Sequence, residues 1–201
     1  YFGETMELRK VMRDCNEAAA KLRTDHPGRF GSFAAINMLD MDGAMREIEY
    51  SLDTLKADGI GLFTSYDNKW LGDDSFDPIW QELNRRQAVV YMHPHENACC
   101  RGLVKGVGAT LVEYGADTTR TIGSLIMNGT TSRFPNIKYI FSHAGGMMPF
   151  LIDRLLGGTA EEVVPGILTK GQGGTGVKGS GYPPKVPKGV LYELRRQYYD
   201  T

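Results

Sequence analysis

The stretch Ala88-Val-Val-Tyr-Met-His-Pro94 decides the fold class that this sequence predicts. Its first five residues are apolar or aromatic and favour β structure, and no polar residue alternates with them. Such a run predicts a short strand that is buried on both faces, which is typical of parallel sheets covered by helices. His93 then stands at the C-terminal end of that strand.

Similar runs predict further strands on both sides of this stretch. These strands are expected at residues 30–39, 60–64, 137–141 and 197–200. Apolar residues spaced three and four apart predict helices between and around them, at 4–24, 42–57, 79–86, 118–127, 148–156 and 190–196. Asp77 is expected to cap the third helix, with Pro78 at its first position. Alternating strands and helices indicate a parallel sheet covered by helices.

Two architectures contain such a sheet. A doubly wound sheet normally carries a glycine fingerprint after an early strand, and this sequence has none. A (β/α)8 barrel typically has eight strands in about 250 residues, whereas this chain of 201 residues offers about five. We therefore predict an α/β fold that is a TIM barrel lacking some of its strands. Residues 1–201 would form a single partial barrel domain.

Composition excludes several classes of partner. Lys and Arg number 23 against 24 Asp and Glu, so no nucleic-acid partner is expected. No apolar run approaches the roughly 20 residues of a membrane-spanning helix, so no membrane association is expected either. Cys15 and the adjacent pair Cys99 and Cys100 form neither a metal motif nor a disulfide framework. We expect an exposed, unbridged pair and a reducing, cytoplasmic location.

Residues 157–189 differ from the rest of the chain. Their centre is Gly171-Gln-Gly-Gly-Thr-Gly-Val-Lys-Gly-Ser-Gly181, which has no hydrophobic period. This composition predicts a glycine-rich loop, either an active-site lid or a flexible linker. The chain that follows is too short for a second core, which favours the lid.

Two of the four histidines occupy equivalent places. His93 directly follows the strand at 88–92, and His143 follows the strand at 137–141 after one serine. Active sites of barrels form at the C-terminal ends of the strands. Imidazole can bind Zn²⁺ and can exchange protons near neutral pH. A purely structural, hydrogen-bonded role is the alternative for each, but the repeated placement favours a functional one.

Three segments together resemble a known family. They are Met92-His-Pro94, Ser142-His-Ala-Gly-Gly-Met-Met-Pro-Phe-Leu-Ile-Asp-Arg154 and Tyr198-Tyr-Asp-Thr201. In order and spacing they resemble the amidohydrolase-related decarboxylases, which include aminocarboxymuconate-semialdehyde, γ-resorcylate and 5-carboxyvanillate decarboxylases. The resemblance implies that barrel strands three to seven are present and that strands one, two and eight are missing. Those missing strands would carry a His-x-His or Glu-x-His pair and an Asp that bind metal in the family.

The resemblance also implies roles for particular residues. His93 resembles a ligand of a single Zn²⁺ or Mn²⁺, and His143 resembles the catalytic residue that assists proton transfer. Arg154 resembles an arginine that binds the substrate carboxylate in a neighbouring subunit, which implies at least a homodimer. His95 is expected to line the substrate pocket, although a His-x-His metal pair with His93 is the alternative. Asp200 is not expected to be a metal ligand.

The function implied by the resemblance is non-oxidative decarboxylation of an unsaturated or aromatic carboxylic acid, dependent on a divalent metal. Two alternatives remain open. The first is metal-dependent hydrolysis of a lactone, amide or C–C bond on the same fold, because fold alone does not determine the reaction. The second is a catalytically incomplete fragment that binds partners through the exposed edges of its sheet.

Overall fold

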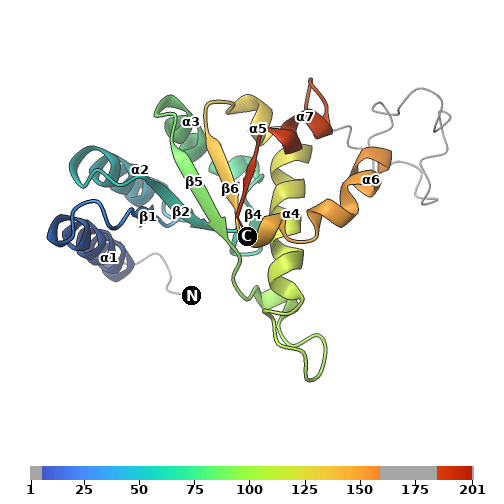
Figure 1. The fold of residues 1–201 in the computed structure, drawn as a ribbon, viewed down its shortest axis with the longest axis horizontal. Coiled ribbons are helices and arrows are strands. Elements are labelled where there is room, and N and C mark those ends of the chain that lie inside the picture. Colours follow the sequence, from blue (N-terminus) through green and yellow to red (C-terminus); the bar gives the residue numbers. More distant parts are fainter. Residues whose placement is uncertain (1–5, 159–184, 201) are drawn as a thin grey trace.

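The computed structural model describes residues 6–158 and 185–200, and its centre is one parallel sheet (Figure 1). The sheet has the order β1-β2-β5-β6-β7. These strands are Phe33–Ala35, Gly59–Phe63, Val89–His93, Lys138–Phe141 and Tyr198–Tyr199. All neighbouring pairs are parallel, and spatial order follows chain order without reversal. A doubly wound sheet reverses direction at a switch point, so this order confirms a partial barrel.

Helices connect consecutive strands, as a barrel requires. α1 (Met6–Asp25) precedes the sheet and α2 (Met41–Glu49) follows β1, continuing as a π-helical turn at Tyr50–Thr54. The remaining helices are α3 (Asp77–Arg85), α4 (Glu113–Met127), α5 (Thr130–Arg133), α6 (Met148–Gly158) and α7 (Val190–Arg195). None of the helices in the described part of the chain is long and apolar enough to cross a membrane.

The two faces of the sheet differ in burial. Ala34, Ile60, Val90 and Tyr139 stand in register across four strands and are all buried in the core. The next residues along, at 35, 61, 91 and 140, are only partly buried. The prediction that each strand is buried on both faces therefore holds for one face. The other face corresponds to a barrel interior, which side chains from all strands normally fill.

Several predicted boundaries need correction. β1 is shorter than the apolar run at 30–39, because the chain leaves the sheet after Ala35 and turns at Asn37, whose side chain accepts from the Leu39 N–H at 3.1 Å. Asp77 is not the N-cap of α3. The turn Asp74–Phe76 runs directly into the helix, so Phe76 occupies the cap position and the Asp77 carboxylate instead pairs with Arg133.

A hairpin and the short helix α5 have no counterpart in the sequence analysis. β3 (Ser65–Tyr66) and β4 (Lys69–Trp70) form an antiparallel hairpin outside the main sheet. Asp67 and Asn68 connect them with φ values of 48° and 59°. Two consecutive positive φ angles define a type I′ turn, which Asp and Asn tolerate well. The expected glycine-rich lid lies largely outside the described residues, because its centre falls within 159–184.

Candidate active site

His93 and His143 lie side by side at the C-terminal edge of the sheet. His93 ends β5 and His143 follows β6, and these two strands are paired with Met92 opposite Phe141. The ring centroids of the two histidines are 5.0 Å apart. Tyr114, near the start of α4, places its ring 6.0 Å from His93 and 6.1 Å from His143. The parallel register therefore brings two residues separated by fifty positions into one cluster.

The hydrogen bond of His93 fixes which ring nitrogen is available. Its Nδ1 lies 2.7 Å from the carbonyl oxygen of Pro94. A carbonyl only accepts, so Nδ1 carries the proton and Nε2 keeps a free lone pair. That arrangement is common for a histidine that binds metal. Among residues 6–158 and 185–200, however, no group of three metal-binding side chains comes together. His93 thus fits as one ligand of an otherwise incomplete site.

The turn that carries His143 has an unusual backbone. His143 and Ala144 adopt φ values of 55° and 53°, and Gly145 and Gly146 follow at 79° and 65°. A non-glycine residue in this region costs of order 1 kcal/mol or more. Surrounding contacts must therefore hold the turn. The Ala144 N–H donates to the backbone oxygen of Asp200 at 2.5 Å, and a side chain at Gly146 would collide with the backbone of Gly115.

Three polar residues beside His143 were not singled out as a group from the sequence. Ser142 places its Oγ 3.2 Å from His143 Nδ1. Tyr91 donates through its hydroxyl to Asp200 Oδ2 at 2.8 Å. Burial and this bond raise the pKa of Tyr91 to about 12, while a hydrogen bond from Ser142 acts in the opposite direction. Tyr91 precedes His93 by two positions on β5, so both side chains point to the same face of the strand. This spacing is the feature of the sequence that could have placed Tyr91 at the site.

His95 turns toward the hairpin instead of His93. Its Nε2 lies 3.0 Å from the backbone oxygen of Ser65 and 3.3 Å from that residue's hydroxyl. Its ring packs 5.1 Å from the ring of Phe63, which is partly exposed at the end of β2. Since Nε2 is used in bonding to Ser65, the alternative of a local His-x-His metal pair has no support in the described residues. Pocket lining by His95 stays a prediction.

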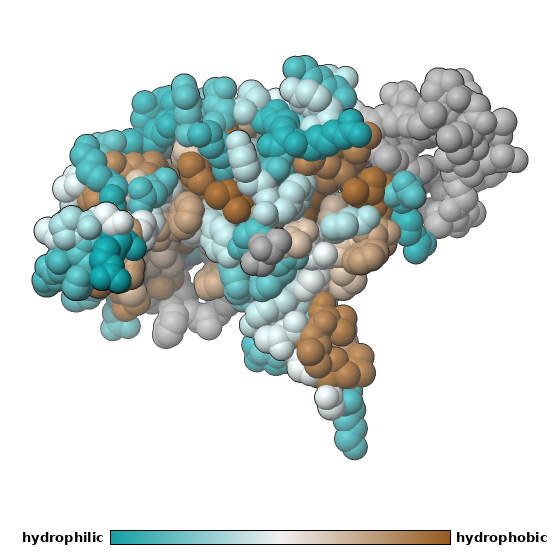
Figure 2. Space-filling view, viewed as in Figure 1, coloured by the Kyte–Doolittle hydropathy of each residue, from teal (hydrophilic) through white to brown (hydrophobic). Residues whose placement is uncertain are grey.

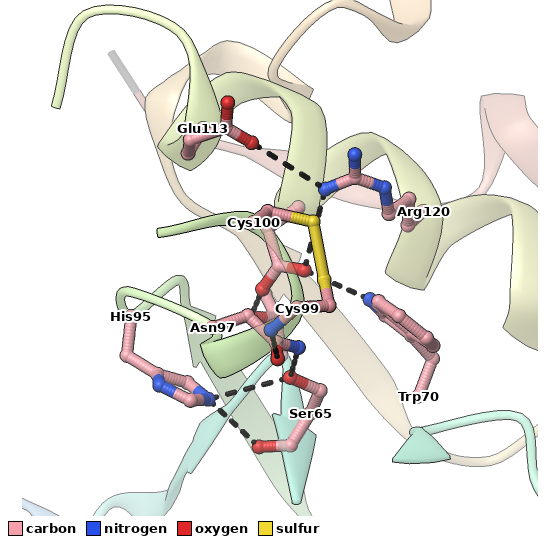
Figure 3. Close-up of a disulfide and its surroundings, with 10 residues drawn as sticks. Ser65, Trp70, His95, Asn97, Cys99, Cys100, Glu113 and Arg120 are labelled. Carbon is pink, nitrogen blue, oxygen red and sulfur yellow. Dashed lines mark hydrogen bonds and ion pairs between the residues drawn. A yellow bond between two sulfur atoms is a disulfide. The ribbon is translucent and has the colours of Figure 1, made fainter. Parts of the chain in front are cut away.

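The adjacent cysteines are bridged, which corrects the sequence analysis (Figure 3). Cys99 and Cys100 belong to the 3-10 turn Ala98–Cys100, and a disulfide bond joins their sulfur atoms. Buried Asn97 connects this turn to the hairpin, because its side chain accepts from the Cys99 N–H at 3.3 Å and donates to Ser65 Oγ at 2.9 Å. The sequence analysis expected an unbridged pair because the spacing of the cysteines does not reveal the local turn geometry that brings the two sulfur atoms together.

Asp117 ties α4 to the end of β2. It is 1% exposed, and its carboxylate accepts from the hydroxyl of Thr64 and from Trp70 Nε1 at 2.9 Å. Thr64 in turn donates its N–H to the backbone oxygen of His93 at 3.2 Å. Asp117 is therefore linked to His93 through Thr64 by two successive hydrogen bonds.

Arg154, in contrast, lies exposed on α6 and makes no ion pair with any described residue.

The family of the chain follows from comparison with known proteins. Residues 2–159 match the family model described as Amidohydrolase. The chain belongs to the amidohydrolase family. Its relatives include the decarboxylase yanB of Aspergillus niger, 43% identical over 72% of this chain and 42% of the relative. The 6-methylsalicylic acid decarboxylase of Penicillium expansum is 38% identical over 72% of this chain and 45% of the relative.

Solved structures share the fold of this amidohydrolase. A dihydroxybenzoic acid decarboxylase from Polaromonas, with bound manganese and the inhibitor 2-nitroresorcinol, matches with a TM-score of 0.73 and 21% identity. The match covers 95% of this chain and 56% of that one. The resemblance seen in the sequence is confirmed at the level of family and fold. The chain spans about half the length of the relatives it matches.

Proposed function

We propose that this chain contributes to the active site of a metal-dependent decarboxylase for an aromatic or unsaturated carboxylic acid. The observation that carries the proposal is the pairing of His93 and His143 at the C-terminal edge of a partial barrel, with ring centroids 5.0 Å apart. Barrel enzymes place their reacting groups at this edge. The two curated relatives described above are both named decarboxylases, which supports the reaction class.

The two histidines take different parts in this reaction. His93 would supply one nitrogen ligand through its free Nε2. A divalent ion held there, Zn²⁺ or Mn²⁺, would bind substrate oxygens as a Lewis acid; the manganese bound to the Polaromonas enzyme supports the choice of a divalent metal. His143 is exposed at the same edge and would pass a proton to the ring carbon that loses carbon dioxide.

Arg154 and His95 are proposed to bind the substrate. Arg154 is exposed on α6 and forms no ion pair with any of the described residues, so it would be available to the carboxylate of a substrate bound in a neighbouring subunit. A homodimer or higher homo-oligomer is part of this proposal. Apolar surface supports it: Figure 2 shows an apolar patch on the projecting segment between β5 and α4, where Leu103, Val104 and Leu111 are exposed. Exposed apolar patches of this kind commonly mark interaction sites.

The test is a carbon dioxide release assay with the full-length protein on a panel of hydroxybenzoates and methylsalicylates, combined with metal analysis. We expect His143→Asn to lower turnover by about 10²- to 10⁴-fold, the usual contribution of a general acid or base, and to leave metal content intact. His26→Asn, on an exposed histidine just after α1, is the matched control and should change neither quantity.

Two outcomes would contradict the proposal. Full activity in His143→Asn would remove that residue from the reaction. Formation of ring-opened acids from lactones, without carbon dioxide from any benzoate, would instead identify a hydrolase on the same fold. The predictions of a cytoplasmic location and of no nucleic-acid partner remain as the sequence analysis states them.

A further inference from the structure

Two opposite sides of helix α4 contact the segments that carry the paired histidines. Gly115 and Thr119 are four positions apart and lie on one side of the helix. Asp117 and Thr121 share the other side, because a shift of two positions rotates a helix by about 200°. The first side meets the turn that follows β6, and the second meets the residue that follows β2.

Thr119 holds the turn that carries His143. Its hydroxyl accepts from the Met147 N–H at 2.8 Å and donates to the Gly115 oxygen at 2.8 Å. Gly146 packs so closely on α4 that an added Cβ would lie 2.2 Å from the Gly115 oxygen. Gly146 also donates its N–H to the His143 oxygen at 2.8 Å. The backbone of His143 is therefore fixed to α4 through the two residues Gly146 and Met147.

Thr121 holds the end of β2, the strand that pairs with β5. Its hydroxyl donates to the backbone oxygen of Thr64 at 2.7 Å, and the Thr64 hydroxyl donates to Asp117. Both threonines are 0% exposed, so water does not compete for these bonds. Thr64 also donates its N–H to the backbone oxygen of His93 at 3.2 Å. All three polar groups of Thr64 are thus bonded, and they connect His93 to α4.

The two histidines are fixed to one helix by separate sets of bonds. We propose that α4 positions them independently, with Thr119 setting the position of His143 and Thr121 that of His93. Both threonines are positioning residues, because each acts through the backbone of other residues. The arrangement of the two rings, with centroids 5.0 Å apart, is what these bonds maintain. Its use in decarboxylation rests on the proposed function.

The test replaces one threonine at a time by valine in the full-length protein, which keeps the shape of the side chain and removes its hydroxyl. Thr119→Val should lower kcat by about 10- to 100-fold, the usual cost of losing a group that orients a reacting residue, and leave the affinity for Zn²⁺ unchanged. Thr121→Val should lower the Zn²⁺ affinity by about tenfold, the lower end of that range, because Asp117 still holds Thr64. At saturating Zn²⁺ its kcat should fall less than that of Thr119→Val. Competition with a fluorescent chelator measures the affinity.

Serine variants and a third threonine provide the controls. Thr119→Ser and Thr121→Ser keep the hydroxyl and should restore the natural values. Thr118→Val is the matched control, since Thr118 is also 0% exposed and its hydroxyl donates to the Tyr114 oxygen within the same helix. This variant should lower the melting temperature as the other two valine variants do, and change neither kcat nor Zn²⁺ affinity.

Hydrogen exchange gives a readout that needs neither metal nor substrate. Mass spectrometry of peptides that cover residues 143–149 should show faster exchange in Thr119→Val, because the Met147 N–H loses its acceptor. In Thr121→Val the exchange of these peptides should equal that of the natural protein.

Several results would overturn the inference. If both valine variants lowered kcat and Zn²⁺ affinity together, a general loss of stability would explain the data, and equal effects of Thr118→Val would lead to the same conclusion. Unchanged kcat or unchanged exchange in Thr119→Val would remove that residue, and unchanged Zn²⁺ affinity in Thr121→Val would remove the other. A natural protein without decarboxylase activity would refute only the proposed function, since exchange and Zn²⁺ affinity still test the two threonines.

Discussion

Removal of the Asp117 carboxylate should destabilise the fold by an amount that its contacts determine. Asp117 is almost fully buried and accepts from the Thr64 hydroxyl and the Trp70 indole N–H. Asp117→Ala leaves both donors without this acceptor. A buried polar group that loses its partner costs about 1–3 kcal/mol. Thr64 is 0% exposed and should incur the full cost, whereas the partly exposed Trp70 can turn to water.

The expected decrease in the free energy of unfolding is therefore about 2–4 kcal/mol, the sum of a full and a reduced penalty. Loss of the ion pair with Arg120 adds little to this cost, because Arg120 lies 3.9 Å from the carboxylate and its side chain is 40% exposed. Asp117→Asn should cost clearly less. Its amide oxygen can still accept from Trp70, and its NH₂ group can donate to the oxygen of Thr64.

Urea denaturation followed by circular dichroism measures these differences through the midpoint and slope. Asp74→Ala is the matched control, since that carboxylate is 71% exposed and pairs only at 3.4 Å with Arg133. Its midpoint should stay close to that of the natural protein. The explanation by hydrogen bonds would be refuted if Asp117→Ala and Asp74→Ala lowered the free energy of unfolding equally. It would also be refuted if Asp117→Asn lowered it as much as Asp117→Ala.

Other features give predictions that can be checked separately. Gly146→Ala should lower the melting temperature, because a φ of 65° and the nearby Gly115 backbone leave no room for a side chain, at a cost of at least 1–3 kcal/mol from backbone strain; an unchanged melting temperature would contradict the turn geometry. Arg85 and Arg86 lower the pKa of Glu82 to about 2 from an ordinary 4.5, so Glu82 should contribute stability above pH 4.5 that is lost as the pH falls toward 2. In acid titrations, Glu82→Gln should reduce the fall in stability between pH 4.5 and 2. The same fall in the variant as in the natural protein would contradict a stabilising interaction of Glu82 with the two arginines. Alkylation with and without a dithiol reductant, followed by mass spectrometry, should modify Cys99 and Cys100 only after reduction; labelling of both without reductant would show that they are not bridged.

Local sequence information was sufficient for the order of the elements and for the position of the two histidines. Apolar runs of five residues predicted β2 and β5 within one residue at each end, because a buried strand leaves a continuous hydrophobic signal. His93 and His143 were then expected at one edge, since parallel strands end on the same side. The hairpin β3–β4 was not predicted, because each of its strands has only two residues, too few to show a hydrophobic periodicity.

Only the tertiary structure decided which side chains surround the histidines. Tyr91 and Asp200 lie 109 positions apart, and Thr64 and Asp117 lie 53 apart, so no local pattern connects either pair. Their hydrogen bonds exist because the register of β5, β6 and β7 and the packing of α4 bring them together. By itself the sequence determined the family, the strand order and the placement of His93 and His143. The structure decided which polar groups meet around His143, because those contacts join residues that lie far apart in the sequence.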